Sequence, residues 1–194
     1  MYTYIEEENG YLQAVIDFVN THFAQREAVP DYRSESGFAD FLSVLENIKN
    51  DTYYQTIFDK AKYLVVNVNN HHFQNGNKRM TITVLLTFLI LNDYELRNES
   101  KEWYKNLLGE LFPENNGLGW DDYNDFNATN FAAYHFILRT SNRESAEYNF
   151  SISHEDMANR IQEFLNRAVV PTNQNAISGD TKSLVRKIFS LIRS

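Results

Sequence analysis

The feature that most constrains the fold is an apolar run near the middle of the chain, MTITVLLTFLIL, at residues 80–91. As a helix, this run would carry apolar side chains on nearly every side, and such a helix is stable only when other elements surround it. Asn92 and Asp93 follow and would end it. Its most apolar part, residues 84–91, is far shorter than the roughly 20 residues that span a membrane. We therefore predict a buried central helix and no membrane span.

The remaining chain supplies helices that could surround the central one. With Gly 7 and Pro 3, the chain has few residues that break helices, which favours long helices over many short strands. Apolar residues recur at helical spacing in several segments. We predict an all-α fold of seven or eight helices. The expected helices are residues 11–25, a segment from Phe38, residues 56–69, 80–91 and 100–111, a segment from Ala128, a segment capped by Ser153, and a basic tail at 181–193.

Charge and cysteine content limit the functional classes. The formal net charge is -8, from 18 Lys+Arg against 26 Asp+Glu, which argues against a broad nucleic-acid surface but is compatible with a local anion site. The absence of cysteine excludes disulfides, thiolate catalysis and Cys-ligated zinc. The amino-terminal residues are acidic and lack the apolar core of a signal peptide. We expect a cytoplasmic protein that binds neither nucleic acid nor membrane.

A polar loop, HHFQNGNKRM, leads directly into the apolar run. The first turn of a helix offers unpaired backbone N–H groups and the positive end of the helix dipole, which together attract anions. Gly76 permits a close backbone approach or a positive φ. Asn77 can cap the helix or contact an oxygen, Lys78 brings a point charge, and Arg79 brings a fork suited to phosphate. These residues predict a phosphate site.

His71 would lie at the end of the preceding helix, close to this phosphate site. A neutral histidine there could accept a proton from a hydroxyl that attacks the bound phosphate. Phosphoryl or nucleotidyl transfer would fit this pairing. The alternative is an ordinary corner between two helices with solvated cations, since Asn-Gly is common in turns. The residues alone leave both interpretations open.

The loop and its flanks closely resemble the Fic/Doc superfamily, whose motif is H-x-F-x-[D/E]-[G/A]-N-[G/K]-R. The lysine at the eighth place, Lys78, resembles the death-on-curing (Doc) branch of the family, whereas Fic adenylyltransferases usually have glycine at this place. The resemblance covers roughly residues 10–95. It implies a Fic/Doc-type helical bundle with a short flap and additional C-terminal helices. We accordingly expect a catalytic domain at 1–145 and a helical extension at 146–194 packed on it.

The resemblance also implies roles for the loop residues. His71 would be the general base, and Gly76, Asn77 and Arg79 would hold the phosphates of ATP or another nucleotide. Lys78 would reshape the anion hole. In the Doc branch this accompanies an inverted nucleotide and transfer of the γ-phosphate to a protein hydroxyl, whereas Fic enzymes transfer AMP. Phosphoryl transfer is the expected activity, with AMP transfer as the second choice.

Asn75 departs from the motif. The family has Asp or Glu at this place, and that carboxylate holds Mg²⁺. Asn offers a neutral carbonyl oxygen, which is a weaker Mg²⁺ ligand. Either the nucleotide phosphates hold the metal, or activity is low, or another carboxylate substitutes. An alternative hypothesis follows, in which the chain is a degenerate family member that binds a nucleotide or a protein.

The resemblance implies two partners. Residues 47–54 lie where the family has its flap, an edge to which a protein substrate adds as a strand. The family's inhibitory motif, [S/T]-x-x-x-E-[G/N], has no match, the nearest segment being 140–145. A toxin of this kind would therefore need an antitoxin in trans. For Trp103 and Trp120 we expect packing roles rather than ligand binding, and we expect His135 at the edge of the core or on the surface.

Overall fold

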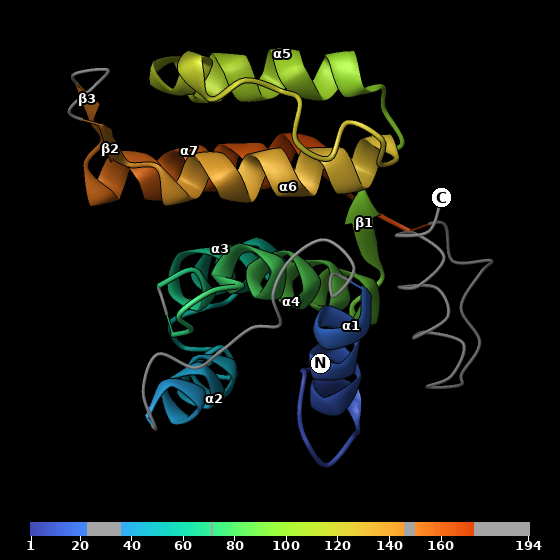
Figure 1. The fold of residues 1–194 in the computed structure, drawn as a ribbon. Helices are drawn as coiled ribbons and strands as arrows, with labels where there is room; N and C mark the ends of the chain where they lie inside the picture. Colours follow the sequence, from blue (N-terminus) through green and yellow to red (C-terminus); the bar gives the residue numbers. More distant parts are fainter. Residues whose placement is uncertain (23–35, 71, 146–149, 173–194) are drawn as a thin grey trace.

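The structure, a computed structural model, describes residues 1–22, 36–70, 72–145 and 150–172, over which the chain is mostly helical (Figure 1). The described helices are α1 (Tyr11–His22), α2 (Gly37–Asn47), α3 (Ile57–Val68), α4 (Asn77–Leu91), α5 (Lys101–Leu111), the short 3-10 helix η1 (Pro113–Leu118), α6 (Ala128–Ser141) and α7 (His154–Ala168). The strands are β1 (Tyr94–Leu96), β2 (Glu144–Ser145), β3 (Phe150–Ser151) and β4 (Val169–Pro171).

The helices form two tiers, with α5, α6 and α7 in one and α1 to α4 in the other (Figure 1). Packing of α3 against α7 and of α4 against α6 joins the tiers. Helix α4 also contacts α1, α3 and β1, and its Val84, Phe88 and Leu89 are fully buried. The prediction of a central apolar helix is confirmed, although the helix begins at Asn77 rather than at residue 80.

Side-chain caps explain why several helices begin where the sequence predicts. Thr56 and Asp59 form a reciprocal capping box at α3, in which each side chain accepts a hydrogen bond from the other residue's backbone N–H. Ser100, Asn127 and Ser153 each accept a backbone N–H from the first turn of α5, α6 and α7. These starts agree with the predicted ones because a cap is a signal contained in a few adjacent residues.

Two small antiparallel sheets correct the prediction of a purely helical fold. Strand β1 follows α4 and pairs with β4, which follows α7, with Leu96 opposite Val169. Both of these side chains are buried. Strands β2 and β3 form a second pair. The expected tail helix at 181–193 and residues 23–25 of the first expected helix lie outside the described residues.

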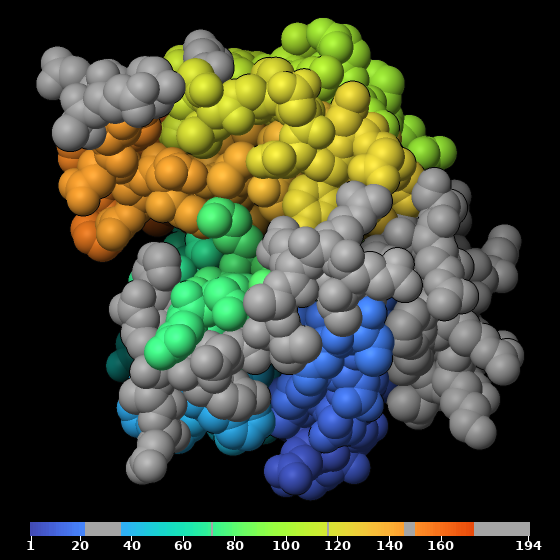
Figure 2. Space-filling view, in the orientation of Figure 1, coloured from blue at the N-terminus to red at the C-terminus, as the bar shows by residue number. Residues whose placement is uncertain are grey.

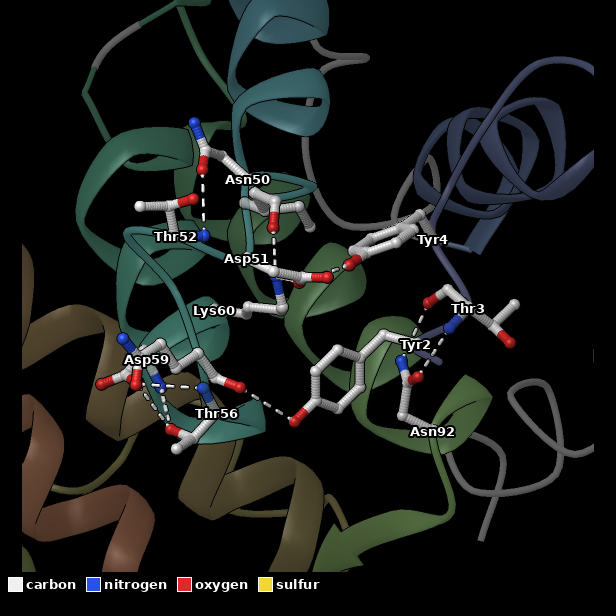
Figure 3. Close-up of polar contacts among 12 residues, drawn as sticks. Tyr2, Thr3, Tyr4, Asn50, Asp51, Thr52, Thr56, Asp59, Lys60 and Asn92 are labelled. Atoms are coloured by element: carbon white, nitrogen blue, oxygen red, sulfur yellow. Dashed lines mark hydrogen bonds and ion pairs between the residues drawn. The ribbon is translucent and has the colours of Figure 1, made fainter.

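The amino-terminal segment runs along the end of α4 (Figure 3). The Asn92 side chain accepts a hydrogen bond from Thr3 N at 2.8 Å and donates one to Thr3 O at 2.9 Å. It therefore binds both backbone groups of Thr3, as a neighbouring strand would. Residues 1–5 are held against the central helix by this contact and by burial of Ile5.

Helix α7, which belongs to the predicted extension, packs against α3 and α5. Its buried residues join the same apolar core as those of α1 to α4. The predicted boundary after residue 145 falls next to residues 146–149, which the structure does not describe. Within the described ranges, no helix is long and apolar enough to cross a membrane.

Candidate functional site

The predicted phosphate site lies where the chain turns from α3 into α4. Gly76 is the residue before α4 and has φ 81° and ψ 2°, a left-handed conformation that side chains rarely tolerate. Glycine is therefore required here for the chain to enter the helix at this angle. Asn77, Lys78 and Arg79 form the first turn of α4, so the four predicted residues are brought together at one helix start.

A reciprocal pair of hydrogen bonds fixes the shape of this loop. Phe73 N donates to Asn77 Oδ1 at 3.0 Å, and Asn77 Nδ2 donates to Phe73 O at 2.8 Å. The Phe73 ring is 1% exposed and packs edge-on against Phe41 at 5.7 Å between centroids. Phe73 therefore anchors the loop in the core. The Asn77 side chain is occupied by these two hydrogen bonds. A ligand would therefore contact the Asn77 backbone N–H and not its side chain.

The two cations of the loop lie in different environments. Lys78 is half-buried, whereas Arg79 is only 4% exposed. Arg79 Nη2 donates to Asn75 Oδ1 at 3.4 Å, and Arg79 O accepts from Thr83 Oγ1 at 2.9 Å. Sequence reasoning placed the Arg79 fork at the mouth of the helix. Its burial means that a phosphate would have to reach inward, or the side chain turn outward, for the two to meet.

The position of Asn75 bears on Mg²⁺. Its side-chain amide oxygen lies 3.4 Å from the Arg79 guanidinium nitrogen Nη2. A neutral oxygen next to a fixed positive charge is a poor Mg²⁺ ligand. Within the described residues, no group of three or more His, Asp or Glu side chains could hold a metal ion. The residues described around Asn75 therefore do not fit a protein-held Mg²⁺ ion.

Of the two histidines in the loop, the structure describes only His72. His71, the predicted general base, lies outside the described residues. His72 Nε2 is 2.7 Å from Asn67 O. A carbonyl oxygen only accepts, so His72 carries its proton on Nε2 and donates it to the last turn of α3. This contact gives His72 a structural role at the end of α3.

The predicted docking flap at 47–54 is a series of turns in this structure (Figure 3). Helix α2 ends at Asn47, and Tyr53 N and Tyr54 N both donate to Asn50 O. Strand addition needs an extended edge with free N–H and C=O groups. Docking of a substrate strand here would therefore require these turns to open first.

A buried lysine holds the same segment in place. The Lys60 side chain is fully buried, and its amine donates to Ile48 O at 2.6 Å and pairs with Asp51 Oδ1 at 2.8 Å. Burial acts to lower the pKa of Lys60, but the bonds to Asp51 and Tyr4 outweigh it and the net shift is upward. The rings of Tyr2 and Tyr4 lie 5.3 and 5.4 Å from this amine. The Lys60 amine, which belongs to α3, thus contacts both the turns and the amino-terminal segment (Figure 3).

A small apolar pocket of about 20 Å³ lies one helical turn along α4 from Arg79. Its lining residues are Ile82, Thr83, Leu86, Tyr123, Phe126, Asn130 and Tyr134. A space of this size accommodates about one water molecule, so it could not hold a nucleotide base without widening. Sequence reasoning missed this pocket. The signal was the pair of aromatics Tyr123 and Phe126 among the polar residues at 121–127.

Comparison of the chain with protein-family models, with curated proteins and with solved structures found no match. The loop geometry and its chemistry are therefore the basis on which a function can be argued.

Proposed function

We propose that the chain is a nucleotide-dependent transferase of Fic/Doc type that moves a phosphoryl group from ATP or a similar nucleotide to a protein hydroxyl. Transfer of AMP is the second choice for the group moved. The single observation that carries the proposal is the left-handed Gly76 immediately before α4, which sets Lys78 and Arg79 in the first turn of a buried helix. A helix start with two cations and a preceding glycine is suited to binding phosphate.

In the proposed reaction, the backbone N–H groups at the start of α4 and the helix dipole hold the nucleotide phosphates. Lys78 and Arg79 offset the negative charge that the leaving phosphates develop. Neutral His71 takes the proton of the target hydroxyl, and the hydroxyl oxygen forms a bond to the γ-phosphorus. The bond from that phosphorus to the β-phosphate oxygen breaks, and the nucleoside diphosphate leaves. Asn77 holds the loop through Phe73 while this occurs.

Further parts of the proposal rest on the resemblance. The fold would be a Fic/Doc-type bundle, with a catalytic domain at 1–145 and an extension at 146–194. A protein substrate would dock at 47–54 after the turns open. The chain would act in the cytoplasm, as the toxin of a pair whose antitoxin acts in trans.

A second candidate is a degenerate member that binds a nucleotide or protein without chemistry. The observation that favours it is the contact between Asn75 Oδ1 and Arg79 Nη2, because it sets a positive charge where the family has a metal-binding carboxylate. Asn75→Asp restores the carboxylate. This variant should gain activity if the degenerate candidate is right, whereas the wild type would already be active under the first proposal.

Label transfer tests the proposal. Purified protein would be incubated with bacterial lysate, Mg²⁺ and ATP labelled at the α or the γ phosphate. We expect label on protein from γ-labelled ATP, and its loss in His71→Ala. His154→Ala is the matched control, because His154 is exposed and contacts Arg143 on the opposite tier from the loop.

Each outcome of this assay separates the candidates. Label from the α position would mean AMP transfer despite Lys78. Equal labelling by wild type and His71→Ala would refute the proposed base. If neither position gives label that depends on His71 and Asn75→Asp gains activity, the degenerate candidate is supported. Tight ATP binding that is lost in Arg79→Ala would argue against an ordinary helical corner.

A further inference from the structure

A second buried guanidinium, Arg139, lies in α6 (Ala128–Ser141). The Arg139 side chain is 1% exposed. Its Nη1 lies 3.3 Å from His135 Nδ1 and also donates to His135 O at 3.3 Å. The Trp120 ring covers it, with Arg139 Cζ 3.7 Å from the ring centroid. The cation is therefore held between one turn of α6 and the connection from α5 to α6.

One edge of this guanidinium is unpaired. Within the described part of the chain, Arg139 Nε and Nη2 are buried and have no hydrogen-bond partner. These two nitrogens form the side-on edge of the guanidinium, which carboxylates and phosphates bind with two parallel hydrogen bonds. Buried donors are almost always satisfied, so an unpaired pair in bidentate geometry indicates a missing acceptor.

The charge on Arg139 is also not balanced by the groups that contact it. Burial alone lowers its pKa to about 10, so the side chain stays charged at neutral pH. His135 Nε2 is 2.9 Å from Asp122 O, which fixes the proton on Nε2 and leaves Nδ1 to accept from Arg139. His135 is thus a neutral neighbour. The face of Trp120 contributes a favourable cation–π contact but no hydrogen-bond acceptor.

Further cations lie close to this cluster. The amines of Lys101 and Lys105, both on α5, are each 5.7 Å from the centre of the Phe131 ring, and that ring lies 4.3 Å from His135. These two amines add positive charge near Arg139, while the nearby Asp122 carboxylate accepts a hydrogen bond from the Tyr134 hydroxyl at 3.3 Å. A buried charge is stable when it is paired, and an anion bound to its two unpaired nitrogens would pair Arg139.

We propose that the Nε–Nη2 edge of Arg139 is a binding site for a small oxyanion, a phosphate or a carboxylate group, beneath Trp120. The anion would accept two hydrogen bonds from this edge and neutralise the buried charge. Trp120 must move for it to enter, and the connection at 113–127 that carries Trp120 lies on the surface between α5 and α6 (Figure 2). Gly119, with φ 61° and ψ -174°, precedes Trp120 in a conformation that is essentially limited to glycine. This site is independent of the proposed transferase site.

Tryptophan fluorescence tests the site directly. The chain has Trp 2, and Trp103→Phe leaves Trp120 as the reporter that lies against Arg139. Phosphate, sulfate and acetate would each be titrated into this variant at constant ionic strength, with sodium chloride as the reference salt. We expect a saturable change in Trp120 emission with at least one oxyanion. The same titration in Trp103→Phe/Arg139→Gln should require at least about tenfold more anion, because two charge-assisted hydrogen bonds are lost.

Matched variants separate this site from other cations. Arg143→Gln makes the same charge change four residues further along the chain, past the end of α6, at a partly exposed arginine and should leave the titration unchanged. Arg79→Ala should also leave it unchanged, which distinguishes this site from the loop before α4. If Arg139→Gln folds poorly, Arg139→Lys keeps the charge without the side-on edge and should still weaken binding. No saturable response, or an equal response in the Arg139 variants, would overturn the proposal. A response to acetate alone would identify a carboxylate ligand, and a response to phosphate and sulfate a tetrahedral one.

Discussion

The buried amine of Lys60 gives the sharpest prediction about stability. Lys60→Met keeps a flexible chain of similar length in the same space but removes the amine. The change therefore tests the polar contacts of Lys60 with little change in packing. It leaves Ile48 O, which accepts from the amine at 2.6 Å, without its donor in a buried setting.

The expected loss can be estimated from these contacts. A hydrogen bond to a charged group contributes about 1.5–3 kcal/mol, and an unsatisfied buried carbonyl costs about 1–3 kcal/mol. Releasing the lysine from its buried position offsets part of this, because burial of a charge is itself unfavourable. We expect Lys60→Met to lower the free energy of unfolding by about 2–3 kcal/mol. The partner carboxylate Asp51 is 74% exposed, so Asp51→Asn should cause less than half of that loss.

Urea unfolding followed by circular dichroism would measure both variants and the double variant. The reasoning requires a large loss for Lys60→Met, a small one for Asp51→Asn, and weak coupling between them. Equal losses in the two single variants would show that the exposed ion pair, and not the Ile48 carbonyl, stabilises the turns. A neutral or stabilising Lys60→Met would show that burial of the charge outweighs its contacts.

Two further predictions concern pH and the helix start. Burial, assisted by Arg139 and Lys105, lowers the pKa of His135 from 6.5 to about 4. Between these two pKa values, His135 is protonated in the unfolded state and neutral in the folded state. Stability should be full above pH 6.5 and fall by about 2–3 kcal/mol on going from pH 7 to 4.5. Urea midpoints across this range would show the fall in wild type and a shallower one in His135→Asn; equal slopes would contradict the assignment. Gly76→Ala should cost about 1–2 kcal/mol, because φ there is 81°. The control Gly109→Ala lies within α5 with open space at its Cβ and should stabilise by about 0.5–1 kcal/mol. If both glycine variants destabilise equally, the left-handed conformation is not the cause.

The extent to which the fold was predictable depended on how local each signal was. The starts of α5, α6 and α7 follow from caps next to the first helical residue, and the core position of α4 follows from its composition. The β1–β4 pair could not be predicted. Its strands are three residues long and distant in sequence, and they meet only because the segment after α4 and the segment after α7 run antiparallel along each other.

The candidate site was predictable as a loop but not in its contacts. Spacing located Gly76 and the two cations at one helix start, and the structure agrees. The closure of the loop by Asn77, the burial of Arg79 and the complete burial of Lys60 and Arg139 were not foreseen. A charged residue is expected on the surface from sequence, and only tertiary packing can place it inside.

The two hydrogen bonds between the Asn92 side chain and the Thr3 backbone affect when the chain can fold during synthesis on the ribosome. The two residues are 89 positions apart, so Thr3 has no partner until the whole of α4 has been made. At about 5–20 residues per second, this takes roughly 5–20 s. During that interval the adjacent aromatics Tyr2 and Tyr4, which later face Lys60, are exposed to the nascent-chain environment. Residues 2–4 therefore reach their native place only after Asn92 has been translated.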